Sequence, residues 1–447
     1  MFNTKKLLLS TAILMSSSAL YAATSAEMAS KLGSELTPIG AEKAANAEGT
    51  IPAWDGGLAT STDRYSNPFA DEKPLFTITA ANADQYKDKL TPGQLAMLNK
   101  YADTYSIPVY PTHRTAALPA EVYAAAKTNA TQANLTDGGN GLQNFTTAVP
   151  FPVPENGLEV IWNHMTRYRG GALERTFVQV PVQANGSFTP VKINEKMSWP
   201  TSLEGGADPK KDANILFYFV QQVEAPARLT GNVLLVHETM NQITQPRQAW
   251  TYNAGQRRVR RAPQIAYDAP GTASDGQRTT DNLDLFNGAP DRYNWELVGK
   301  QELYIPYNSY KLADRGLTYE DILKPGHMSP ELTRYELHRV WKVEATLKEG
   351  ERHIYAKRTF YIDEDSWQIA VVDHYDGRGE LWRVGEAHQF QYRDVNVPWL
   401  TAEALYDLQS GRYLVGSLTN EEGDGFDFTQ RFKHKDFTPQ AIRRLGK

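Results

Sequence analysis

The stretch YELHRVWKVEATLKEGERHIYAKRTFYIDEDSWQIAVVDHYDGRGELWRVGEAHQFQY, residues 335–392, decides the fold class. Polar and apolar residues alternate along its first run, and only Arg339 and Val340 break the pattern. The alternating residues are Tyr335, Leu337, Trp341, Val343 and Ala345 on one side and Glu336, His338, Lys342, Glu344 and Thr346 on the other. A period of two predicts a strand with one buried face. Turn sequences separate three further strand-like runs at 353–362, 367–375 and 380–392, so the stretch predicts a four-stranded antiparallel meander.

Strand-like runs continue outward from the meander and fill the chain from about Val149. They cover residues 158–168, 174–183, 187–199, 215–223, 232–238, 248–253 and 257–261. Asn185-Gly186, between the second and third of these runs, is a strong hairpin signal. Because twist accumulates over so many strands, the sheet must curl or close. We therefore expect an α+β protein with one large curled antiparallel sheet, helices against its concave face and an apolar groove there.

The N-terminal part of the chain has a more helical pattern. The sequence predicts helices at 26–47 (interrupted by Gly33 and Pro38), 80–90, 92–105 and 119–129, followed by a polar loop at 131–148. Thr91-Pro92 is typical of a helix start, with a capping hydroxyl followed by proline in the first turn. The predicted division is therefore a helical section at 24–148 and a sheet domain at 149–447.

Residues 1–23 have the pattern of a secretory signal peptide. Lys5 and Lys6 provide the positive start, residues 7–20 form an apolar run softened by serines, and Ala22 and Ala23 offer a small-residue cleavage site. The run is short for a membrane-spanning helix, although a retained N-terminal anchor is the alternative. We expect export to the periplasm with cleavage near Ala22 or Ala23, and possible association with the outer membrane.

The composition excludes several classes of function. The chain has 47 Lys and Arg against 52 Asp and Glu, a net charge of −5, which makes nucleic acid an unsuitable partner. It contains no cysteine, so disulfides, zinc–thiolate sites, thiol nucleophiles and a lipidated N-terminal cysteine are all excluded.

No motif in the chain predicts catalysis or a cofactor. G-x-S-x-G, the P-loop and G-x-G-x-x-G are all absent from the sequence. Asp363, Glu364 and Asp365 have the chemistry to hold a cation, but turn formation between two strands explains them more simply. We therefore expect no catalytic residue, no cofactor and no metal site.

The densest basic cluster is formed by Arg257, Arg258, Arg260 and Arg261. On an acidic protein such a basic patch is suited to lipid phosphates or an acidic partner. The alternative is a solvated strand whose arginines pair with some of the many carboxylates.

Aromatic residues on the predicted strands are the candidates for a ligand-binding wall. Phe217-Tyr218-Phe219 places bulky rings on both faces of one strand, so one face is free to line a cavity. The candidate ligand-binding residues are Trp162, Phe177, Phe217, Phe219, Trp250, Trp341 and Phe360. Ordinary core packing is the alternative for each of them, and Trp341 has the strongest pattern for burial.

Several stretches spread over the chain carry a family resemblance. They are Leu36–Glu42, Gly49–Gly57, Pro150–Pro152 with Ile161–His164, Trp250–Tyr252 with Arg257–Pro263, Pro306–Asn308, and Arg358–Gly377. In them the sequence resembles the exported bacterial proteins grouped as domain of unknown function 1329, which look like distant relatives of the LolA/LolB outer-membrane lipoprotein carriers. The resemblance implies an antiparallel half-barrel with helices plugging an apolar cavity, and work with a resistance–nodulation–division (RND) exporter and an outer-membrane partner. It implies no catalytic residue, and the absence of cysteine separates this chain from lipid-anchored LolB-like members.

Two non-enzymatic functions lead from the sequence, and an enzyme, which titratable side chains converging in a cleft would favour, is the third. The first is a periplasmic carrier or chaperone for a hydrophobic ligand, such as a lipid or an acylated molecule. The second is a non-enzymatic adaptor that contacts an exporter or an outer-membrane barrel. A large apolar cavity would favour the carrier, and a filled core with an exposed apolar patch would favour the adaptor.

Overall fold

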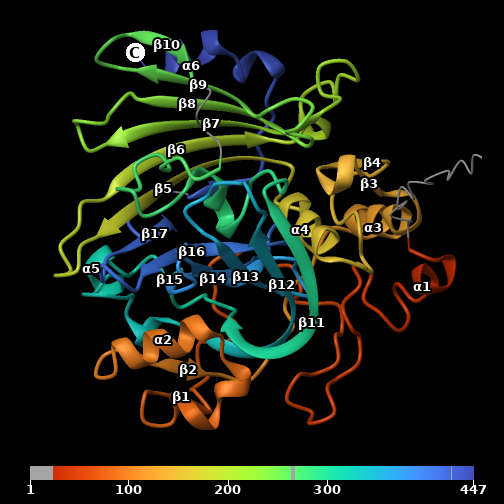
Figure 1. The fold of residues 1–447 in the computed structure, drawn as a ribbon, viewed down its shortest axis with the longest axis vertical. Coiled ribbons are helices and arrows are strands. Elements are labelled where there is room, and N and C mark those ends of the chain that lie inside the picture. Colours follow the sequence, from red (N-terminus) through yellow and green to blue (C-terminus); the bar gives the residue numbers. More distant parts are fainter. Residues whose placement is uncertain (1–23, 263–266, 424, 447) are drawn as a thin grey trace, which may run out of the picture.

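One sheet of 16 strands dominates the computed structural model, which describes residues 24–262, 267–423 and 425–446 (Figure 1). The predicted signal peptide lies outside these residues. The strands of the large sheet are β1 (Phe76–Ile78), β2 (Ile107–Val109), β5 (Ala172–Val182), β6 (Val191–Ser198), β7 (Ile215–Ala225), β8 (Val233–Thr239), β9 (Gln248–Asn253), β10 (Arg258–Arg261), β11 (Tyr293–Pro306), β12 (Tyr335–Leu347), β13 (Lys357–Asp363), β14 (Ile369–Tyr375), β15 (Leu381–Tyr392), β16 (Val397–Asp407), β17 (Tyr413–Leu418) and β18 (Phe426–Asp427). A separate small sheet pairs β3 (Asn134–Thr136) with β4 (Gly141–Gln143). The α-helices are α1 (Ala26–Ser30), α2 (Pro92–Lys100), α3 (Ala120–Gln132), α4 (Gly157–Thr166), α5 (Tyr319–Ile322) and α6 (Pro439–Leu445).

The predicted meander is confirmed as β12–β15, which pair in sequence order and antiparallel. The structure extends it by three strands that the sequence pattern did not reveal: β16 and β17 follow β15, and β11 pairs with β12. A bulge between Leu297 and Gly299 interrupts the alternation in β11, which explains why its pattern was missed.

Two antiparallel runs of strands join into one open, curled sheet. The path leads from β1 and β2 through β12–β17, passes from β17 to β5, and ends at β10. The predicted hairpin at Asn185-Gly186 connects β5 and β6, with Gly186 at a φ of +85° that suits glycine. Nearly all pairs are antiparallel, and the single parallel contact joins Tyr335 to Val109. The predicted curled antiparallel sheet is therefore confirmed.

The concave face of the sheet is covered by α4 and by the irregular segment 267–290, around which the strands curl (Figure 1). Residues 158–168 were predicted as a strand, and this prediction was wrong, because α4 occupies Gly157–Thr166. Asn156 caps this helix by accepting a hydrogen bond from the Glu159 backbone N–H. The negative charge of Glu159 in the first turn is favourable beside the positive end of the helix dipole. These end signals outweigh the strand preference of Val160 and Ile161.

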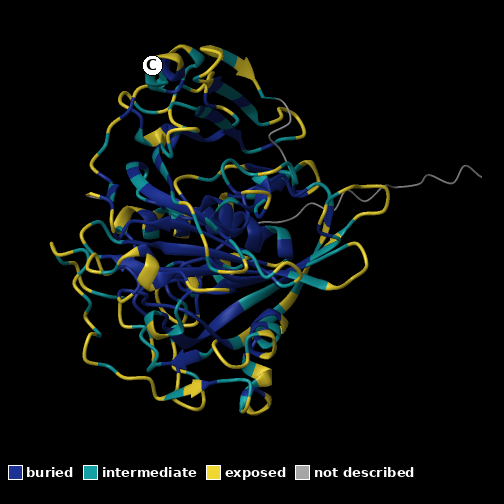
Figure 2. Ribbon diagram, turned by 90° about the vertical axis from the view of Figure 1, so that its left-hand side faces the viewer, coloured by how far each residue is buried: buried dark blue, intermediate teal, exposed yellow. Residues whose placement is uncertain are grey.

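The convex face is covered by α2, α5 and α6. Both faces of the central strands are therefore buried, and exposed residues concentrate in the loops and outer segments (Figure 2). The capped helix predicted from Thr91 is confirmed as α2, in which Thr91 and Gln94 form a reciprocal capping box.

The N-terminal section is less helical than predicted. The predicted helix at 26–47 is wrong beyond Ser30, since α1 covers only five residues, and 80–90 contains only two short 3₁₀ turns. The strands β1 and β2 of this section belong to the large sheet. The division at residues 148 and 149 stays a prediction.

Candidate functional site

Two adjoining cavities lie between the concave face of the sheet and segment 267–290. The β7–β8 cavity is lined mainly by Phe217, Phe219, Leu234, Val236 and Leu283, and has a volume of about 60 Å³. The smaller β5–β6 cavity, about 20 Å³, is lined by charged and aromatic residues of β5, β6 and β16. Gln221, Arg278 and Leu283 line both, so the two cavities adjoin at these residues, and together they are called the inner groove below.

Three of the seven predicted ligand-binding residues line the inner groove. Phe217 and Phe219 form the wall of the β7–β8 cavity, and Phe177 lines the β5–β6 cavity. Trp162 and Phe360 belong to the same apolar cluster but are packed away from both cavities. The indole of Trp162 donates a hydrogen bond to the Gly139 carbonyl, at 2.9 Å.

The remaining two predicted residues, Trp250 and Trp341, lie elsewhere. Trp250 belongs to the cluster on the opposite face of the sheet, where it packs beside His237, so it does not share a wall with Phe219. Trp341 was predicted to be buried, and this prediction was wrong: it is only half-buried. It packs against the margin of the apolar cluster, stacked on Trp367, and the Lys300 ammonium lies 4.7 Å from the centre of its ring.

Arg278 is the groove residue with the most unusual surroundings among those that sequence reasoning missed, which also include Gln221 and Val236. Only 11% of its side chain is exposed, yet its guanidinium donates no hydrogen bond to any residue that the structure describes. The nearest carboxylate oxygen, on Glu403, is 3.9 Å away. Burial lowers the pKa of Arg278 and raises that of Glu403 to about 7. An isolated arginine in a loop has no pattern that would have marked it.

Buried ion pairs fix segment 267–290 to the concave face at two points. Asp284 accepts hydrogen bonds from Arg167 and from Arg169, the latter at 3.0 Å. Asp281 accepts from Arg358 at 2.6 Å and contacts His353 at 3.0 Å. Although burial by itself raises their pKa values, the neighbouring positive charges hold the pKa of both carboxyls well below the usual range. Residues 281–284 are therefore firmly held.

By contrast, residues 270–279 form a flap that is bonded mostly to itself. The Gly271 N–H donates to the Arg278 carbonyl at 2.8 Å, and Pro270 bridges Thr279. Few hydrogen bonds join the flap to the sheet. Gln179 donates to the Thr272 carbonyl at 2.9 Å, and Arg383 donates to the carbonyls of Gln277 and Gly276. At the exposed edge, Asp275 contacts Arg412 and Gln183. The flap covers the inner groove without a helix or strand.

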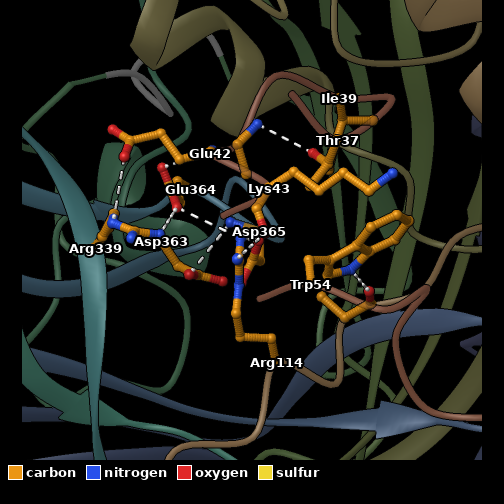
Figure 3. Close-up of polar contacts among 12 residues, drawn as sticks. Thr37, Ile39, Glu42, Lys43, Trp54, Arg114, Arg339, Asp363, Glu364 and Asp365 are labelled. Carbon is orange, nitrogen blue, oxygen red and sulfur yellow. Dashed lines mark hydrogen bonds and ion pairs between the residues drawn. The ribbon is translucent and has the colours of Figure 1, made fainter. Parts of the chain in front are cut away.

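The acidic turn 363–365 lies in a buried polar network away from the inner groove (Figure 3). Both oxygens of Asp365 accept hydrogen bonds from Arg114, at 2.7 and 2.8 Å. Glu364 lies 2.7 Å from the Lys300 ammonium and accepts from the Glu42 backbone N–H at 3.3 Å. Burial nevertheless raises the pKa of Glu364 to about 7. These contacts attach the N-terminal stretch Leu36–Glu42 to the sheet.

The same turn contains one group with metal-ligand chemistry. His338, Asp363 and Asp365 each offer a ligand atom, and these atoms lie within 4.8 Å of one another. Asp365 is already neutralised by Arg114, and Asp363 accepts a hydrogen bond from the Ser366 hydroxyl at 2.5 Å. The absence of a metal site thus stays a prediction, and this cluster is the place to test it.

The basic patch lies at the free edge of the sheet. Arg257 occupies the turn before β10, and Arg258, Arg260 and Arg261 are exposed on that strand. Among the described residues none of the four forms an ion pair. Helix α6, with Arg443 and Arg444 in its last turn, packs beside β10. The patch is thus solvated rather than neutralised.

A model of the family described as protein of unknown function (DUF1329) matches residues 77–443. An uncharacterized protein of Pseudomonas aeruginosa is 61% identical over 452 residues, covering 99% of both chains.

Two solved structures are similar at low identity. One is a DUF1329 family protein from Desulfovibrio piger, with a TM-score of 0.41, 14% identity, and coverage of 61% of this chain and 91% of that one. The other is a LolA superfamily protein from Nitrosomonas europaea, with a TM-score of 0.38, 10% identity, and coverage of 64% and 98%. Within the described ranges, no helix has the length and apolar character needed to span a bilayer. Because the family model matches most of the chain, this protein belongs to the DUF1329 family.

Proposed function

We propose that this protein is a non-enzymatic carrier for a hydrophobic small molecule, bound in the inner groove beneath the flap 270–279. One observation supports this above all: an apolar wall of Phe217, Phe219 and Val236 faces a cavity whose cover is a loop. Transfer toward the outer membrane from an RND exporter is the pathway that the family resemblance implies, and it is part of the proposal.

The size of the inner groove requires the flap to move during loading. Its two cavities, of about 60 and about 20 Å³, together hold only about five water molecules, at about 15 Å³ each. Ligand pockets typically measure about 300–1,000 Å³. Since residues 281–284 are fixed by buried ion pairs, the part free to lift is the flap, with Arg278 at its base.

The energetics favour this opening. Burying a twelve-carbon chain contributes up to about 10 kcal/mol at about 0.8 kcal/mol per methylene, before ordering costs. Releasing the flap breaks the Gln179–Thr272 hydrogen bond and the two from Arg383. At about 0.5–1.5 kcal/mol each, these three cost about 1.5–4.5 kcal/mol, and the exposed contacts of Asp275 with Arg412 and Gln183 add about 1 kcal/mol or less. Chain burial is therefore the larger of the two contributions.

The adaptor is the second candidate, and its supporting feature would be an exposed apolar docking patch. The exposed large hydrophobic residues of the described chain lie on four separate segments: Leu75, Ile243, Val298 and Ile354. This distribution gives the adaptor less support than the inner groove gives the carrier.

The experiment compares one chemical change at two matched positions. Phe219→Tyr places a hydroxyl in the β7–β8 cavity, and Phe360→Tyr places it in the filled part of the same cluster. A buried hydroxyl without a partner costs about 1–3 kcal/mol. We expect Phe219→Tyr to weaken binding of a fluorescent fatty acid about 5- to 150-fold while Tm changes by only a few degrees.

Phe360→Tyr is the control, and we expect it to lower Tm while leaving the affinity for the probe unchanged. If the wild-type protein never binds the probe, the carrier proposal fails and the adaptor takes its place. Equal effects of the two variants on affinity would remove the inner groove as the binding site.

A further inference from the structure

The unpaired guanidinium of Arg278 is a feature that an apolar carrier site does not need. Arginine has five N–H donors, and a buried one normally finds acceptors for them. Here the side chain is almost nine-tenths buried at the junction of the two cavities, and among the described residues no acceptor receives a hydrogen bond from it. Its Nε is buried without a partner.

A second polar group faces the same junction. Gln221, on β7, is 5% exposed, lines both cavities, and has no side-chain hydrogen bond within the described ranges. Its amide and the Arg278 guanidinium are thus two hydrogen-bonding groups left free at the point where the apolar wall of Phe219 ends. Together they resemble the polar end of a site for an amphiphile.

The charges that line the inner groove balance in number, but Arg278 is the arginine of this lining that lacks a close carboxylate. Two ion pairs are local: Arg247 with Glu238 at 2.9 Å, and Arg175 with Glu195 at 2.6 Å. Asp284 is shared by Arg169 and by Arg167, which lies outside the lining. The ion-pair partner of Arg278 is Glu403, whose oxygen is 3.9 Å away, and Glu195 also acts on Arg278 through its charge. The lining arginines are Arg169, Arg175, Arg247 and Arg278, against the carboxylates of Glu195, Glu238, Asp284 and Glu403. A buried guanidinium without a hydrogen-bonded anion is unfavourable until an anion joins it.

We infer that the inner groove takes an amphiphile with a single anionic head, a long-chain carboxylate, whose head binds Arg278 and Gln221. The inference rests on the proposed carrier function and names its ligand class. The planar guanidinium matches a carboxylate with two parallel hydrogen bonds, and the Gln221 amide supplies a third donor. The apolar chain then lies along Phe217, Phe219 and Leu234. Because Arg278 belongs to the flap, binding of the ligand's carboxylate head also holds the flap closed over the ligand's apolar tail.

The test uses two probes with the same chain, dodecanoate and dodecanol, and measures their affinities by isothermal titration calorimetry at pH 8. We expect the wild-type protein to bind dodecanoate at least about ten-fold more tightly. Arg278→Gln should abolish this preference by weakening dodecanoate alone, and Arg278→Lys, which keeps the charge but loses the paired geometry, should retain part of it.

The matched control is Arg228→Gln, the same change at an exposed arginine outside the inner groove, which should leave both affinities unchanged. Because the Arg278 side chain has no hydrogen bond to lose among the described residues, its replacement should not lower Tm. Equal binding of both probes, unaffected by Arg278→Gln, would overturn the anionic-head inference while the carrier proposal stands. Failure of both probes to bind would instead refute the carrier proposal.

Discussion

Replacing Asp284 by asparagine should destabilise this protein by about 3–5 kcal/mol, because it breaks a buried ion cluster without changing its shape. Asp284 is 5% exposed and accepts hydrogen bonds from the guanidinium groups of Arg167 and Arg169, which are both 2% exposed. The variant leaves these two cations in a dry interior without an anion. Such a loss is a large part of the 5–15 kcal/mol that typically stabilises a folded domain.

The pH dependence provides a second measurement of the same effect. The two arginines hold the pKa of Asp284 below its usual range, so the folded state favours the charged carboxylate. Its contribution is fully present above the unfolded pKa of about 3.9 and is lost as the pH falls from there toward the lowered folded pKa. The difference between wild type and variant should therefore be constant from pH 6 to 8 and shrink below about pH 4.

The assay is urea unfolding followed by tryptophan fluorescence, with Asp275→Asn as the matched control. Asp275 lies on the same segment and pairs with Arg412, but 58% of its side chain is exposed, so its loss should cost less than about 1 kcal/mol. If Asp284→Asn lowers the free energy of unfolding no more than Asp275→Asn does, the ion cluster does not hold segment 267–290. Movement of the flap alone would then lose its support.

Three further predictions concern the rest of the chain. Arg114→Met should lower the free energy of unfolding by about 3–5 kcal/mol, since it leaves Asp365 buried without its partner. Because Arg114 also donates to the Lys43 carbonyl, the variant should expose the bond after Lys43 to trypsin, and unchanged cleavage would contradict this. Removing divalent cations with a chelator should leave Tm unchanged; a fall of several degrees that His338→Ala abolishes would instead assign a metal to the cluster at the acidic turn. N-terminal sequencing of the periplasmic form should begin near Ala23 or Thr24, whereas a product that keeps Met1 and pellets with membranes would contradict the signal peptide.

The meander was predictable because its signals are local. Alternation of period two and turn residues between the runs act within ten residues or so, and they identify β12–β15 without knowledge of the rest of the chain. The start of α2 was predictable for the same reason, since Thr91 and Pro92 act on the adjacent turn.

The cover of the inner groove was not predictable because its contacts are distant in sequence. Asp284 pairs with Arg167 across 117 residues, and Asp281 pairs with Arg358 across 77. No periodicity within 267–290 reports such partners. The aromatic candidates show the same limit: the pattern finds rings that point away from solvent, but only the packed sheet separates Phe219, which lines a cavity, from Phe360, which fills the core.

The basic strand β10 has a consequence for self-association. As the last strand of an open sheet it presents free backbone N–H and C=O groups, which form a template for strand addition by a second copy and hence for aggregation. Exposed arginines at 258, 260 and 261 would face the same charges on an approaching β10, and Arg443 and Arg444 of α6 add to the repulsion. The positive edge therefore disfavours the addition of a second β10 to this unclosed sheet.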